Sequence, residues 1–161
     1  MARPMRSWPV LVALLCAITI EMMPLPAWMQ PFRPPLPAMV LIYWVMMWPE
    51  RFNLGFAFLL GICLDILHGQ LLGQNALVLT VVTFITLRFH LQIRIFPLWQ
   101  LTMTVFALLT LGAFLEFLIE GIAGLLPVGM SRWGRVLAGT ALWAPVMGIM
   151  DRLRMTVEFR R

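Results

Sequence analysis

The chain has 161 residues, of which 61% are hydrophobic and only 12% are charged. Soluble domains carry roughly 25% charged residues, and a chain of this length cannot hide so much apolar surface from water. The composition excludes a soluble globular domain and a disordered chain. It predicts an all-α, polytopic integral membrane protein, with one transmembrane domain over residues 1–161.

The charge of the chain comes from arginine, which supplies all twelve basic residues and a formal net charge of +5. The arginines stand singly or in pairs at the ends of apolar runs, where residues that flank membrane spans are placed. We therefore expect no nucleic-acid partner, although a basic chain would otherwise suggest one.

Apolar runs separated by proline, glycine and arginine predict six transmembrane helices, since about 20 residues cross a bilayer. In chain order they cover residues 8–23, 35–48, 53–67, 72–87, 97–120 and 132–150. Arg3 and Arg6 before the first run imitate a signal peptide, but the bulky Leu15 before Cys16 argues against cleavage there. We expect a retained first helix, followed by an ordered outer loop over 24–37.

The distribution of arginines predicts the orientation of the chain. Six spans with the N-terminus inside place nine arginines on the inner side. Three remain on the outer side, Arg33, Arg132 and Arg135. Because positively charged loops stay inside, we predict that both termini are cytoplasmic.

Four acidic residues then fall toward the outer face, each near the C-terminal end of a predicted helix: Glu21, Asp65, Glu116 and Glu120. The helix dipole disfavours negative charge at that end. Acids within spans usually pair with another group or face a wet cavity. We therefore expect each of these acids to have a partner, a polar cavity or contact with lipid headgroups.

Asp65 is the most informative of the four, because it is the only charged residue between Arg51 and Arg88. Gly61, one turn earlier, is expected to allow close approach of another helix, and Gly69 and Gly73 follow. We predict that leucine at Gly61 or Gly73 weakens assembly. The Asp65 carboxylate is expected to be ionised and to cap backbone amides near Gly69, or else to contact Arg33, Arg132 or Arg135.

Two interpretations of these residues stay open. Asp65 is either a structural residue or part of an outward polar site that binds a ligand or a partner helix. Glu120 is expected to reach the lipid headgroups, whereas Glu116 lies one turn deeper and fits both interpretations. Asp65→Asn should then impair function more than Glu120→Gln. His68 and His90 fall on opposite sides of the membrane, so we expect no metal site.

The segment from residue 44 to residue 73, WVMMWPERFNLGFAFLLGICLDILHGQLLG, resembles the most recognisable stretch of the bacterial rod shape-determining MreD family. The matching positions are Pro49, Arg51, Gly55, Phe58, Gly61, Asp65, Gly69, Leu72 and Gly73. The resemblance extends over nearly the whole chain, because four further segments are similar to the family: 32–34, 43–44, 98–100 and 142–145. Ala57, where many members have glycine, and His68 depart from the pattern.

The resemblance implies a part of the rod complex, or elongasome, in the bacterial inner membrane, with no catalytic activity. We expect no cofactor. It implies association with the bitopic protein MreC and, through it, with MreB, RodA and a penicillin-binding transpeptidase. It also implies a bundle like the substrate-binding S component of energy-coupling-factor transporters. We predict a non-enzymatic scaffold that supports peptidoglycan synthesis and rod shape. The alternative is a small-molecule or lipid-binding, transporter-like component with an outward-facing polar pocket.

Overall fold

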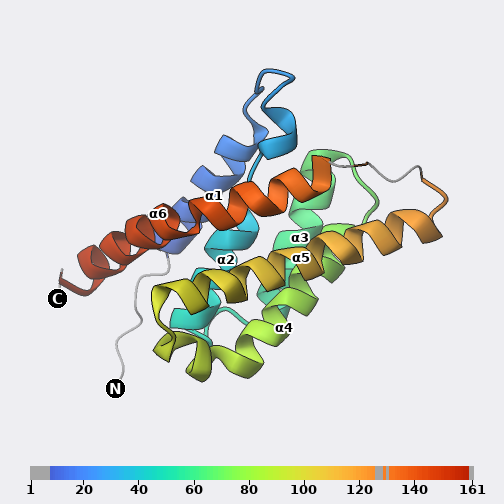
Figure 1. Ribbon diagram of the computed structural model, residues 1–161. Coiled ribbons are helices and arrows are strands. Elements are labelled where there is room, and N and C mark those ends of the chain that lie inside the picture. The colour runs from blue at the N-terminus through green and yellow to red at the C-terminus, as the bar shows by residue number, and fades with distance from the viewer. Residues whose placement is uncertain (1–7, 126–128, 130, 160–161) are drawn as a thin grey trace.

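The computed structural model describes residues 8–125, 129 and 131–159. These residues form six α-helices and one short 3-10 helix, and no strand (Figure 1). In chain order the elements are α1 (Trp8–Met22), η1 (Gln30–Phe32), α2 (Leu36–Met47), α3 (Leu54–His68), α4 (Gln74–Ile95), α5 (Leu98–Ile122) and α6 (Ser131–Phe159). The all-α prediction is confirmed.

Helices α1, α2 and α3 end within one residue of their predicted limits, because strong local signals mark those ends. The Asn53 side chain accepts a hydrogen bond from the Phe56 backbone N–H at 3.1 Å and caps the start of α3. Gly69 ends the same helix in the left-handed conformation, with φ of 61°. The Gln70 N–H then bonds the Asp65 carbonyl at 3.1 Å, which satisfies one of the free carbonyls of the last turn.

Helices α4 and α6 are longer than predicted, and this is a correction. The expected ends at 87 and 150 mark the limits of apolar runs, but the helices continue to Ile95 and Phe159. Arg88 and Arg152 change the polarity of the chain without interrupting a helix, because arginine is a good helix former. Helix α4 stops only before Pro97, which disfavours helical backbone at the residue before it.

Two helices, α4 and α5, are long and apolar enough to cross a membrane. Helices α1 and α3 are apolar but have 15 residues each. The six predicted spans therefore correspond to six helices in the described residues, of which two have the length and composition of a full crossing.

Helix α2 occupies the centre of the fold, where it packs against α1, α4 and α6. Its residues from Met39 to Met46 are all buried, and Trp44 is completely covered. Trp143 of α6 is equally buried. The two buried tryptophans of the core therefore come from α2 and α6, two helices far apart in the chain, and Phe52 of the α2–α3 connection is buried beside Trp44.

The connections gather at two ends of the molecule (Figure 1). The start of α1, the end of α6 and the connections α2–α3 and α4–α5 lie at one end. The η1 loop, the α3–α4 connection and the start of α6 lie at the opposite end, which we call the η1 end. Arg33, Arg132 and Arg135 all belong to elements at the η1 end. Arg3, Arg6, Arg160 and Arg161, which entered the predicted charge distribution, lie outside the described residues.

The predicted loop over 24–37 has a defined structure built around η1. The Arg33 guanidinium donates to the Met23 carbonyl at 2.6 Å and closes the loop at its base. The other side of the loop packs on α6, where a Cβ added at Gly134 would lie 2.4 Å from the Pro31 carbonyl oxygen. Gly134 thus allows the loop and α6 to touch backbone to backbone.

Candidate functional site

Asp65 lies in the last turn of α3, and its carboxylate meets the first turn of α4. Oδ1 accepts hydrogen bonds from the Asn75 backbone N–H at 2.8 Å and from the Asn75 side-chain amide at 3.0 Å. Oδ2 accepts from the backbone N–H of Gly73 at 2.8 Å and of Ala76 at 3.4 Å. The first amides of a helix have no acceptor within the helix and carry partial positive charge. The start of α4 therefore compensates a charge that the end of α3 disfavours.

Of the two contacts expected for Asp65, the structure contains the capping arrangement. The capped amides begin at Gly73, four residues beyond the expected position at Gly69. None of the hydrogen bonds or ion pairs of Asp65 within the described part of the chain involves an arginine. The side chain is 0% exposed, so this carboxylate faces neither solvent nor lipid.

The three glycines of the α3–α4 hairpin have different roles. A Cβ added at Gly61 would lie 2.2 Å from Ala76 Cα, so the backbones of α3 and α4 are in contact there, as expected. At Gly69 and Gly73 an added Cβ would meet nothing within 4 Å, but φ is 61° and 97°. Within this chain, close helix approach does not explain Gly73, whose left-handed backbone favours glycine. Whether a partner helix approaches Gly73 stays a prediction.

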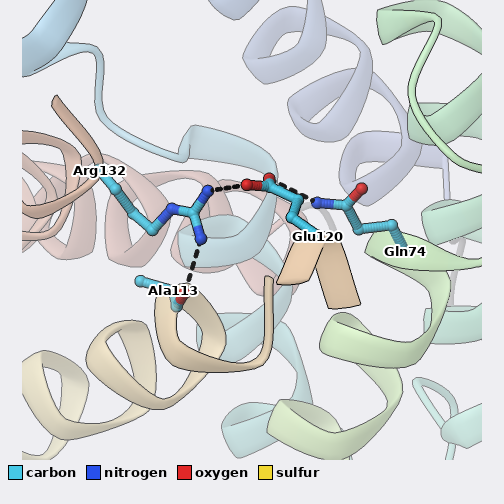
Figure 2. Close-up of polar contacts among 4 residues, drawn as sticks. All are labelled: Gln74, Ala113, Glu120 and Arg132. Carbon is cyan, nitrogen blue, oxygen red and sulfur yellow. Dashed lines mark hydrogen bonds and ion pairs between the residues drawn. The ribbon is translucent and has the colours of Figure 1, made fainter. Parts of the chain in front are cut away.

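Glu120 belongs to a buried polar cluster that joins α4, α5 and α6 (Figure 2). Its carboxylate pairs with the Arg132 guanidinium at 2.5 Å and accepts from the Gln74 side-chain amide at 3.1 Å. Arg132 also donates to the Ala113 carbonyl at 3.4 Å. The side chains of Arg132 and Glu120 are only 7% and 13% exposed.

The expected position of Glu120 among lipid headgroups is therefore wrong. The start of α6 packs against the end of α5 and brings Arg132 over the carboxylate. A buried acid of this kind needs a charged partner, and removing either member leaves an uncompensated charge.

The remaining outer arginines bind other groups at the η1 end. Arg135 of α6 pairs with Glu21 of α1 at 3.2 Å, which links the first and last helices. Arg33 bonds the Met23 carbonyl. The three predicted arginines and the four predicted acids thus lie at one end of the molecule, but the pairs that form are Arg132–Glu120 and Arg135–Glu21.

A pocket of about 330 Å³ opens at the η1 end and is bordered by residues from every α-helix. Its charged lining consists of Glu21, Arg33, Glu116 and Arg135. His68, Gln30, Gln70 and Asn75 add further polar groups. Asp65 and the three hairpin glycines do not line it. Within the described residues Glu116 forms no hydrogen bond or ion pair. The sequence analysis named all four of these charged residues among its outward acids and arginines, but it did not predict which of them would meet.

Sequence reasoning missed two sets of polar residues. The first set is Gln74, which binds Glu120, and Asn75, which binds Asp65. Both directly follow Gly73 at the start of a helix, and this position is the signal that could have identified them. At the opposite end Tyr43 donates its hydroxyl hydrogen to Asp151, which fastens α2 to α6. Arg154 lies beside this pair, 4.0 Å from Asp151. No sequence signal connects Tyr43 with Asp151, because 108 positions separate them.

A family model described as rod shape-determining protein MreD matches residues 3–152. The chain belongs to the MreD family. It is 30% identical over 152 residues to the rod shape-determining protein MreD of Haemophilus influenzae, and the alignment covers 92% of each chain. No solved structure matches this chain. MreD proteins are membrane-associated and act in rod shape determination, and MreD is not a known enzyme family.

Proposed function

We propose that this chain is a non-enzymatic scaffold of the bacterial inner membrane that binds an MreC-like bitopic partner. Through that partner it would support MreB, RodA and a penicillin-binding transpeptidase in peptidoglycan synthesis. The observation that carries the proposal is the MreD family match over residues 3–152. The described residues add support, because they form helices with short connections and so offer a partner mainly helix faces.

The topology of this scaffold is one domain of six spans with both termini cytoplasmic and the η1 end facing outward. The alternation of connections between the two ends (Figure 1) and the grouping of Arg33, Arg132 and Arg135 at the η1 end support it. Helix α2 is too short to cross alone, but α1, α4 and α6 shield it from lipid. The likeness to transporter S components stays a prediction.

Reporter fusions test the topology directly. A reporter fused after Arg161 should give a cytoplasmic signal, whereas one inserted within residues 24–29 should give a periplasmic signal. A periplasmic signal from the C-terminal fusion would contradict the six-span arrangement.

Helix packing in lipid is the mechanism of partner binding in this proposal. Lipid supplies no hydrophobic drive, so helices associate through close contacts at small residues and through a few polar bonds. Gly61 is not available to a partner, because Ala76 of α4 already occupies its surface. Gly121 of α5 and Gly148 of α6 are exposed, and a Cβ added at either meets nothing within 4 Å. Both positions can therefore accept a larger residue without disturbing the fold itself.

The experiment is recovery of an MreC-like partner with the tagged protein from membranes. The native chain should retain the partner at a constant ratio. Gly121→Leu and Gly148→Leu report whether either face is the docking surface, and Glu50→Gln, an exposed change at the other end of the molecule, is the control. A folded native chain that retains no MreC-like partner would contradict the proposal, whatever the variants do.

A further inference from the structure

The pocket at the η1 end is not required for partner binding as proposed above, and its chemistry points to a ligand. Four charged side chains from four separate segments line it: Glu21 of α1, Arg33 after η1, Glu116 of α5 and Arg135 of α6. Its volume of about 330 Å³ has room for roughly ten groups the size of a water molecule. That is the scale of a small polar headgroup.

The two arginines have hydrogen-bonding capacity that the protein does not use. A guanidinium offers several N–H donors in a planar fork that suits phosphate and carboxylate groups. Within the described residues Arg33 makes one hydrogen bond, to the Met23 carbonyl, and Arg135 makes one, to Glu21. The Nε of each side chain is buried without an acceptor. Most of their donors are therefore left for an anionic group.

Glu116 supplies the opposite charge in the same pocket. It is half-buried, and no hydrogen bond or ion pair joins it to another described residue. Its neighbour one turn on, Glu120, is already paired with Arg132. Arg132 and Arg135 lie near enough to attract its charge, but neither forms an ion pair with it. Its carboxylate oxygens are therefore left to accept hydrogen bonds from a cationic group of a ligand. A ligand with one anionic and one ammonium group could therefore bind the two arginines through the first group and Glu116 through the second.

The pocket continues into an apolar one. A smaller pocket of about 50 Å³ shares Glu116 and Arg135 with the first and extends between α4 and α5. Val82, Leu108 and Leu109 are among its lining residues, together with Arg132. A polar cavity that opens into an apolar one fits an amphiphile, and lipids are the amphiphiles that a membrane-associated chain meets at the highest concentration.

We propose that this pocket binds the phosphoethanolamine headgroup of a membrane lipid. The phosphate lies against Arg33 and Arg135, the ammonium group lies against Glu116, and the first part of an acyl chain enters the apolar pocket. The scaffold proposed above would thus also bind a lipid. Lipid binding is tested without the MreC-like partner, so the two proposals can fail separately.

The experiment is native mass spectrometry of the purified protein after exposure to equal amounts of phosphatidylethanolamine and phosphatidylglycerol. Both lipids carry a phosphate, but only the first carries an ammonium group. The native chain should retain phosphatidylethanolamine about tenfold better, the effect of one charge-assisted hydrogen bond. Glu116→Gln should remove this preference without weakening phosphatidylglycerol binding, because the change also removes a negative charge that repels an anionic lipid. Glu50→Gln, the same change on an exposed residue, should keep it.

Equal retention of the two lipids by the native chain would overturn the proposal, and so would a preference that survives in Glu116→Gln. If Glu116→Gln does not fold, Ala38→Leu, which fills both pockets from α2, must reduce phosphatidylethanolamine retention at least several-fold. Free phosphoethanolamine is added in a separate arm. If it raises the melting temperature as much as the lipid does, the ligand is a soluble molecule and the lipid assignment is wrong.

Discussion

Asp65 and Glu120 occupy similar places in the sequence, but in the structure they have different kinds of hydrogen-bond partners. Each is an acid in the last turn of an apolar helix that reaches the η1 end. Asp65 binds groups that lie 8 to 11 positions further along the chain, most of them backbone amides of the next helix. Glu120 binds side chains 12 and 46 positions away, on α6 and α4. The first site is made by a local hairpin and the second by tertiary packing.

The two sites also meet at the first turn of α4. Backbone amides of Gly73, Asn75 and Ala76 bind Asp65, while the side chain of Gln74 binds Glu120. One turn therefore connects α3 to α5. The comparison teaches that an acid at the end of an apolar helix, without a sequence-local cation, can be satisfied by the positive end of another helix as well as by an arginine.

The largest effect is expected from Gly61→Ala, which should break the hairpin that makes the Asp65 site. The new Cβ would lie 2.2 Å from the Ala76 backbone, and no side-chain rotation can relieve that contact. We expect a loss of at least about 3 kcal/mol in the free energy of unfolding, the upper range for overpacking. Thermal or denaturant unfolding in detergent micelles measures it.

Gly148→Ala is the matched control, since its Cβ meets nothing within 4 Å. Replacing an exposed helical glycine with alanine should leave the protein as stable or slightly more stable. Equal stability of the two variants would mean that α3 and α4 do not touch at Gly61.

Asp65→Asn should have the next largest effect. The asparagine keeps the shape but carries a single acceptor oxygen, so some of the amides of α4 that Asp65 now binds lose their partner. A buried donor left unsatisfied costs about 1–3 kcal/mol, and we expect a loss near 3 kcal/mol. At matched protein levels, cells that depend on this chain should lose rod shape. Normal rods together with an unchanged unfolding free energy would refute the capping role.

Glu120→Gln should follow, with a loss of about 2 kcal/mol. That is below the usual cost of about 3–5 kcal/mol for breaking a fully buried pair, because the Glu120 side chain keeps some exposure. The sequence predicted the same order relative to Asp65→Asn for a reason that is wrong, namely contact of Glu120 with headgroups. Adding Arg132→Gln should recover part of the loss, since no uncompensated charge then remains. A further loss in the double variant would show that the pair itself is not what stabilises the cluster.

Gly73→Ala should have the smallest effect, about 1 kcal/mol, because only its left-handed backbone is disturbed. Gly73→Asn should cost less still, since asparagine adopts this conformation more readily. The same unfolding measurement separates the two variants. A loss from Gly73→Ala as large as that from Gly61→Ala would mean that steric contact, rather than φ, explains both glycines.

The sequence predicted the existence of all six helices and the ends of the first three. Those ends depend on local signals, such as the Asn53 cap, the proline after Trp48 and the left-handed Gly69. The ends of α4 and α6 were missed, because a change from apolar to charged residues at Arg88 or Asp151 marks a change of surroundings and does not interrupt backbone hydrogen bonding.

The polar partners were harder to predict, and for a physical reason. Three arginines and the backbone amides near Gly69 were all possible partners for Asp65. The sequence does not show which of them Asp65 binds, because two of the arginines lie on α6 and their positions depend on how α6 packs. The closeness of Arg132 to Glu120 likewise results from the position of α6 on α5. An outward-facing polar pocket was only the alternative prediction, and the sequence could not show which charged residues line it, since they come from four segments that only the fold brings together.

The central claim is that the first turn of α4 couples the two acidic sites, and a double-mutant cycle tests it most directly. The unfolding free energies of Asp65→Asn, Glu120→Gln and the double variant are measured in the same detergent. Asp65→Asn with Asp151→Asn, at the other end of the molecule, is the control pair. We predict a coupling energy of at least about 0.5 kcal/mol for the first pair and additivity for the control. Additive losses in the first pair, within about 0.3 kcal/mol, would contradict the claim.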